Sequence, residues 1–157
     1  MKLKEKLYQL KNDKKAILAA NFYNFETLSG ILQASAKVEI PVILQLSESS
    51  IEYLGLKVAV SMARSAIKEY GAEAWLHLDH GSSELVVRKC LDAGFDSVMI
   101  DASEKQLQEN IEISRNVVEI ASGYDACVEA ELGYVAKLGQ SQDNLGFTSP
   151  DDALYFV

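Results

Sequence analysis

The stretch "AWLHLDHGSSELVVRKCLDAGFDSVMID", residues 74–101, decides the fold, because it holds a strand, a helix and a second strand in succession. Residues 74–80 and 97–101 are mostly apolar and short, which is typical of buried strands. Residues 83–94 between them have the pattern of a helix that ends at Gly94. A strand, a helix and a strand in this order predict two parallel strands joined by a covering helix.

The same alternation extends over the rest of the chain. Further strands are predicted at 16–22, 42–47 and 126–132, and further helices at about 1–14, 26–39, 58–71 and 104–123. Another helix begins near the end of the sequence, where Ser149 is a suitable N-cap and Pro150 occupies the first helical position. The chain therefore contains five strand–helix units, the last of them cut off, and predicts a parallel sheet covered by helices.

Both a doubly wound sheet and a (β/α)8 TIM barrel fit this alternation. A doubly wound sheet usually has a glycine-rich turn after its first strand, but the turn here is "NFYNFE", without glycine. A barrel instead collects the carboxyl ends of all its strands around one pocket. Polar residues follow every predicted strand: Asn21 and Asn24, Ser47, Asp79 and His80, Asp101 and Ser103, and Glu131. We therefore prefer the barrel, with only about strands 1–5 present, since a whole one needs about 250 residues.

Composition narrows the class of protein. The 157 residues are 48% hydrophobic and 24% charged, with a net charge of −8 and no basic run, which argues against a nucleic-acid partner. No apolar run approaches the roughly 20 residues of a membrane helix, and the N-terminus lacks the apolar core of a signal peptide. Cys90 and Cys127 have no metal-binding spacing and are typical of reduced core residues in a cytoplasmic protein.

Both histidines of the chain lie at the end of the third predicted strand. His80 is a candidate metal ligand; the alternative is a histidine that only forms a hydrogen bond at a strand end. We interpret His77 as a polar residue that fills the barrel interior or orients a neighbour. Asp79 precedes the next helix by too many residues to cap it, and a carboxylate there could exchange protons with a substrate hydroxyl. Asp101 and Glu131 end the next two strands and could supply oxygen ligands, although catalytic zinc sites more often carry more histidines.

The motifs "HLDHG", "SVMIDAS" and "VEAELG", in this order, resemble the class II, metal-dependent ketose-bisphosphate aldolases, which act on fructose or tagatose bisphosphate. Further segments are similar to the same family, and together they extend the resemblance over essentially the whole chain: "AANFYNFET", "IPVILQLSESSIEYLG" and "GFTSPDDALYFV". The resemblance implies a TIM-barrel lyase of carbohydrate metabolism. It would cleave a ketose 1,6-bisphosphate reversibly into dihydroxyacetone phosphate and glyceraldehyde 3-phosphate with Zn²⁺ or another divalent metal.

The resemblance also implies roles for individual residues. His80 matches the family's first zinc ligand, and Asp79 matches the acid/base that handles the C4 hydroxyl. Asp101 and Glu131 match two carboxylates near the family's metal. Asn21 and Ser47 match two positions that line its substrate pocket. Family members are commonly homo-oligomers when full-length.

Two departures from the family pattern matter. The family's other zinc histidines and its main phosphate loops follow strands 6 to 8, which this chain does not supply. We therefore expect residues 1–157 to be the N-terminal part of one barrel domain, either truncated or half of a split protein, and inactive alone. In the loop after strand 5, Gln142 and Asp143 occupy the family's Glu-Asp pair, and Gln142 cannot act as a base. A noncatalytic or split-barrel subunit and an unrelated α/β binding protein remain as alternatives.

Overall fold

A computed structural model of the chain describes residues 1–133 and 147–157, and in it five parallel strands form one sheet in the order of the sequence. The strands are β1 (Leu18–Asn21), β2 (Val42–Ser47), β3 (Ala74–Gly81), β4 (Ser97–Ile100) and β5 (Cys127–Ala130). Strand order that follows chain order, with parallel pairing throughout, is the arrangement of successive βαβ units in a barrel wall. All five predicted strands are present.

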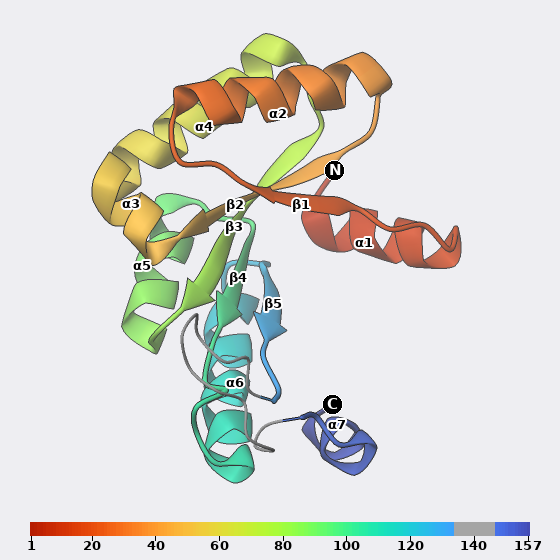
Figure 1. Cartoon of the computed structure of the whole chain (residues 1–157), viewed down its shortest axis with the longest axis vertical. Helices are drawn as coiled ribbons and strands as arrows, with labels where there is room; N and C mark the ends of the chain where they lie inside the picture. Colours follow the sequence, from red (N-terminus) through yellow and green to blue (C-terminus); the bar gives the residue numbers. More distant parts are fainter. Residues whose placement is uncertain (134–146) are drawn as a thin grey trace.

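Helices separate the strands, and the helices that lie between β1 and β5 in the chain cover one face of the sheet (Figure 1). The helices are α1 (Leu3–Asn12), α2 (Phe25–Val38), α3 (Glu48–Leu54), α4 (Leu56–Tyr70), α5 (Glu84–Ala93), α6 (Leu107–Ser122) and α7 (Pro150–Phe156). Sequence reasoning missed α3, a seven-residue helix between β2 and α4, because "SESSIEYL" is too short to show helical periodicity clearly.

The strand sequences explain how the sheet is covered. In β2, Val42, Leu44 and Leu46 are buried, whereas the residues between them are only partly buried. The buried set packs with apolar residues of the covering helices into a single core cluster. Apolar burial of this kind contributes about 25 cal/mol per Å² of apolar surface removed from water, so it fixes the sheet against the helices.

The opposite face, called the inner face here, carries one row of residues across all five strands, four of them polar and the fifth a cysteine. Register pairs connect five residues in turn: Asn21, Gln45, His77, Ser97 and Cys127. Paired residues in a parallel sheet project to the same side, and so do residues two positions further along each strand. The inner face therefore also receives the residues at the carboxyl ends of the strands.

Helix α1 lies on the other side of the sheet from α2 and α4 (Figure 1). The Trp75 indole donates a hydrogen bond to the Met1 carbonyl over 3.2 Å, and Lys6 forms an ion pair with Glu73 at 2.7 Å. These contacts hold α1 against the amino-terminal end of the strands. The carboxyl ends of the strands are consequently the ones left accessible for a site.

Helix boundaries follow the signals in the sequence. Ser83 caps α5 by accepting a hydrogen bond from the Val86 amide, and Gly94 ends that helix with a positive φ of 100°. Asn24 caps α2 in the same way through the Thr27 amide. None of the helices in the described ranges is long and apolar enough to cross a membrane.

Candidate functional site at the carboxyl ends of the strands

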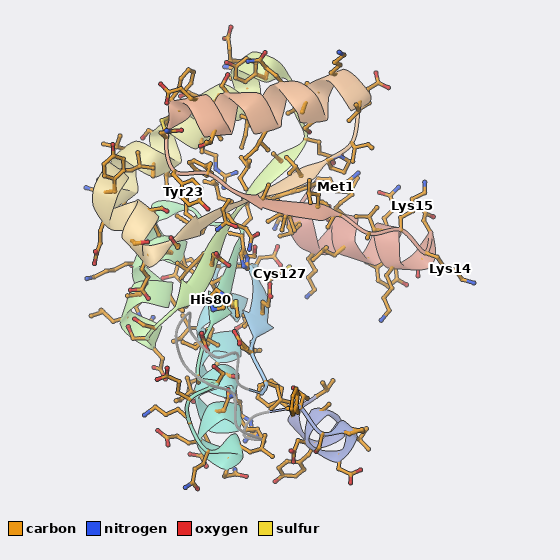
Figure 2. All side chains as sticks on the ribbon, viewed as in Figure 1. Met1, Lys14, Lys15, Tyr23, His80 and Cys127 are labelled. Carbon is orange, nitrogen blue, oxygen red and sulfur yellow. The ribbon has the colours of Figure 1, made fainter. Side chains whose placement is uncertain are left out.

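The carboxyl ends of β3, β4 and β5 bring one histidine and two acids together. His80 Nδ1 lies 2.9 Å from Asp101 Oδ2 and 3.3 Å from Glu131 Oε2. One candidate ligand atom from each of the three lies within 4.8 Å of the other two. Figure 2 shows His80 at the arrowhead ends of the strands. We call these three residues the His80 cluster.

An irregular backbone aims the His80 side chain at the acids. The β3–β4 register shifts between Leu78 and Gly81, and His80 has a positive φ of 51°. Without the shift, strand alternation would turn His80 to the helix-covered face, opposite to Asp79. Gly81 makes the shift possible, because a Cβ there would lie 2.7 Å from the Met99 carbonyl oxygen. A left-handed histidine is a strained residue, and strain of this kind is frequent at functional sites.

Asp101 is held by its own loop. The Ser103 hydroxyl and backbone amide donate to Asp101 Oδ1 over 2.6 and 3.1 Å, which leaves Oδ2 for His80. Burial acts to raise the pKa of Asp101, but the hydrogen bonds from Ser103 and His80 outweigh it and lower that pKa. Asp101 is thus a carboxylate whose two oxygens have separate partners.

The charges of the cluster support one another. The hydrogen bond to Asp101 raises the pKa of His80, and neighbouring carboxylates add to this effect against burial. Burial and the Asp101 charge raise the pKa of Glu131, with His80 opposing them. The two acids therefore favour a positive charge at His80 Nδ1, and the same carboxylates would attract a cation to this place.

Asp79 lies on the inner face and is held from two other strands. Asn21 Nδ2 donates to Asp79 Oδ2 over 2.7 Å, and Gln45 Nε2 donates to Asp79 Oδ1 over 3.1 Å. Each carboxylate oxygen thus accepts one amide hydrogen bond, from β1 and β2 respectively. This arrangement fixes the orientation of the carboxylate and leaves lone pairs on both oxygens free to accept a proton.

His77 is buried on the inner face, with 4% of its surface exposed. Its Nδ1 shares a hydrogen bond of 2.8 Å with Ser97 Oγ, and its Nε2 lies 3.6 Å from Glu129 Oε2. Burial lowers the pKa of His77 despite the nearby Glu129 and Asp79 charges. The structure therefore gives His77 a supporting position and leaves it out of the His80 cluster.

Ser47 ends β2 and caps the unpredicted helix α3. Its hydroxyl oxygen accepts from the Ser50 amide over 3.4 Å and lies 3.0 Å from the Ser49 and Ser50 hydroxyls. Ser47 and Asp79 are register partners, so both project from the inner face. All six candidate residues from the sequence therefore lie at one end of the sheet, in two groups around Asp79 and His80.

Comparisons with known proteins decide the family. The family described as "Fructose-bisphosphate aldolase class-II" matches residues 1–157. The chain belongs to this family. The resemblance drawn from the "HLDHG", "SVMIDAS" and "VEAELG" motifs is thereby confirmed.

Individual relatives agree with this assignment. A fructose-bisphosphate aldolase of Helicobacter pylori is 39% identical over 137 residues, which are 87% of this chain and 44% of the relative. The D-tagatose-1,6-bisphosphate aldolase subunit GatY of Klebsiella oxytoca is 36% identical over 140 residues, 89% of this chain and 48% of that relative. The chain spans about half the length of the curated relatives it matches.

A solved structure confirms the barrel. The crystal structure of the YdjI aldolase from Escherichia coli K12 superimposes with a TM-score of 0.82 at 26% sequence identity. The match covers 99% of this chain and 56% of that one. The five-stranded sheet is accordingly a partial TIM barrel, as the alternation of strands and helices predicts.

Two contacts of the site escaped sequence reasoning. Gln45 was detectable, because strict alternation in "VILQLS" puts it on the same face as Ser47. Asn110 of α6 bonds the Glu131 carbonyl over 2.8 Å, and nothing in the sequence distinguishes it from a surface amide. Gln142 and Asp143 lie outside the described residues.

Proposed function

We propose that the protein is a class II aldolase. It cleaves fructose or tagatose 1,6-bisphosphate reversibly into dihydroxyacetone phosphate and glyceraldehyde 3-phosphate. The observation that carries the proposal is the pairing of an oriented carboxylate, Asp79, with a potential metal-binding group next to it, the His80 cluster. We further propose that residues 1–157 are the N-terminal part of one cytoplasmic barrel domain that forms homo-oligomers when full-length.

The donor atoms of the His80 cluster fit a divalent metal. One imidazole nitrogen and two carboxylate oxygens suit zinc or another first-row cation, and His80 Nδ1 lies 2.9 Å and 3.3 Å from the nearest oxygens of the two acids. We assign His80, Asp101 and Glu131 as ligands. When bound, the metal supplies a Lewis acid that polarises the sugar carbonyl and stabilises the charge that develops on it.

Asp79 moves the proton in this proposal. In the cleavage direction it accepts the C4 hydroxyl proton, so that C4–O becomes a carbonyl as the C3–C4 bond breaks and its electron pair passes to the ketone side. Asn21 keeps Asp79 oriented and, together with Ser47, lines the substrate pocket. Both side chains project from the inner face beside the carboxylate, where a sugar hydroxyl must approach.

Metal binding and cleavage test the proposal separately. Calorimetry with Zn²⁺ and Co²⁺ is expected to show binding by the chain and its loss in His80→Ala. Cleavage is measured for the chain alone and mixed with a polypeptide that carries the remaining half of the Helicobacter pylori relative. Asp79→Asn is expected to retain metal affinity while cleavage falls by about 10²–10⁴-fold.

The exposed Asp13 provides the matched control, since Asp13→Asn makes the same chemical change at the end of α1. This variant should behave like the unmodified chain in both assays. Cleavage that survives EDTA, or that survives Asp79→Asn, would contradict the mechanism.

A second candidate function is a subunit that needs a partner chain. It is favoured by the free outer edges of β1 and β5, because the described residues pair no further strand with either. If this candidate holds, the purified chain should bind a polypeptide carrying the other half of a barrel and should cleave no sugar bisphosphate even when that half is supplied.

A further inference from the structure

Asn110 is a fully buried amide on an otherwise ordinary amphipathic helix. The buried residues of α6 are Asn110, Ser114, Val117 and Ala121, which form one core-facing stripe. The stripe is apolar near its end but begins with two polar residues, and Asn110 is only 2% exposed. A buried amide is destabilising unless its hydrogen bonds are satisfied, so an apolar residue would be the default here.

The Asn110 amide is satisfied by the residue that follows β5. Asn110 Nδ2 donates to the Glu131 carbonyl over 2.8 Å, and Asn110 Oδ1 accepts from the Ser114 hydroxyl over 3.1 Å. The Glu131 carbonyl fixes the orientation of the amide, because a carbonyl only accepts and only the NH2 group can donate to it. The Ser114 hydroxyl then donates to the amide oxygen at the other end.

Glu131 needs such a partner because it lies one residue beyond the regular strand. β5 ends at Ala130, so the Glu131 carbonyl has no place in the sheet ladder. The next carbonyl, that of Leu132, is likewise bound by a side chain: the Thr148 hydroxyl donates to it over 2.9 Å. The carbonyls of two successive residues are thus bound by side chains, whereas within a strand they would be bound by the backbone of the neighbouring strand.

We infer that Asn110 is a positioning residue for the metal ligand Glu131. By holding the Glu131 carbonyl, it fixes the backbone from which that side chain reaches His80 Nδ1 at 3.3 Å. Asn110 does not contact the metal-binding atoms and acts only through the Glu131 main chain. This inference rests on the proposed role of the His80 cluster as a metal site.

The test measures Co²⁺ and Zn²⁺ affinity of the chain by calorimetry for Asn110→Leu, a change close in volume that removes the donor. The dissociation constant is expected to rise about 10–100-fold, the usual effect of losing a group that orients a ligand. Asn116→Leu is the matched control, because Asn116 lies on the exposed side of α6 and bonds only Glu84 in the described contacts. It should leave the affinity within twofold.

A double variant separates positioning from general destabilisation. If Asn110 acts through Glu131, then Asn110→Leu combined with Glu131→Gln should bind metal no more weakly than Glu131→Gln alone. Additive losses would overturn the inference, and so would unchanged affinity in Asn110→Leu.

A measurement on the unmodified chain keeps the inference testable if Asn110→Leu fails to fold or if the chain binds no metal. Nuclear magnetic resonance should show a through-hydrogen-bond coupling from the Asn110 side-chain nitrogen to the Glu131 carbonyl carbon, and slow exchange of that amide relative to Asn116. Absence of both would overturn the positioning contact. Absence of metal binding with both present would refute the proposed metal site instead.

Discussion

The left-handed backbone of His80 predicts that glycine is more stable than alanine at this position. A φ of 51° costs a residue with a Cβ about 1–2 kcal/mol, and glycine adopts it freely. Glycine lowers the free energy of unfolding by about 0.4–1 kcal/mol relative to alanine, because the unfolded chain with glycine has more conformational freedom. The difference leaves His80→Gly more stable than His80→Ala by about 0.8 kcal/mol, or roughly 2 °C in melting temperature for a chain of this size.

Urea unfolding followed by circular dichroism, in EDTA, measures this difference. Both variants lack the imidazole, so the lost contacts to Asp101 and Glu131 cancel in the comparison. Ser82 is the control: it is exposed and has no positive φ, so Ser82→Gly should be less stable than Ser82→Ala. If His80→Ala equals or exceeds His80→Gly in stability, the strain assigned to this backbone does not exist.

Three further outcomes follow from the same region and its core. Gly81→Ala should destabilise the chain by about 1–3 kcal/mol, because its Cβ would press on the Met99 carbonyl; an unfolding midpoint equal to that of the unmodified chain would contradict this crowding. In metal-free protein, proton magnetic resonance should show that His80 titrates above pH 6.5, because its hydrogen bond to Asp101 raises its pKa. His77 should titrate below pH 6.5, because burial lowers its pKa. The reverse order would refute both environments. Burial raises the pKa of Cys90 to about 12, so a thiol reagent at pH 8 should modify it only as fast as the chain unfolds, and rapid modification would show that this core is open.

Sequence reasoning recovered the strands well because their signal is local. Apolar runs bounded by helix caps such as Ser83 and Gly94 identify each βαβ unit without tertiary information. The short helix α3 was lost because seven residues give less than two full turns of pattern. The end of β5 was placed two residues too late, since the alternation in "CVEAEL" continues past Ala130 although pairing with β4 stops there.

The sequence predicted which candidate residues lie together at the strand ends, but it did not predict the geometry of their contacts. Polar residues at strand ends pointed to Asp79, His80 and the two later acids, because a barrel gathers those ends. The turn of His80 away from its alternating position depends on a register shift, which Gly81 permits but does not by itself specify. The Asn110 contact depends on which turn of α6 packs against the end of β5. Tertiary packing decides this, because the two residues in contact are 21 positions apart in sequence.

Strand β3 separates the partners of Asp79 from the partners of His80, which come from the β2 side and the β4 side of it in the sheet. Among the described residues, the hydrogen bonds to Asp79 come from β1 and β2, whereas its neighbour His80 faces groups carried by the segments after β4 and β5. Two adjacent residues thus have their contacts in different parts of the chain. The register shift between Leu78 and Gly81 turns His80 toward its own set of partners.

Under the proposed roles, substitution of Asn21 or Gln45 should alter proton transfer by Asp79 without removing a contact of His80. Substitution of Ser103 should alter the proposed metal ligand Asp101 without removing a contact of Asp79. The two properties could then change independently although Asp79 and His80 are joined by a single peptide bond.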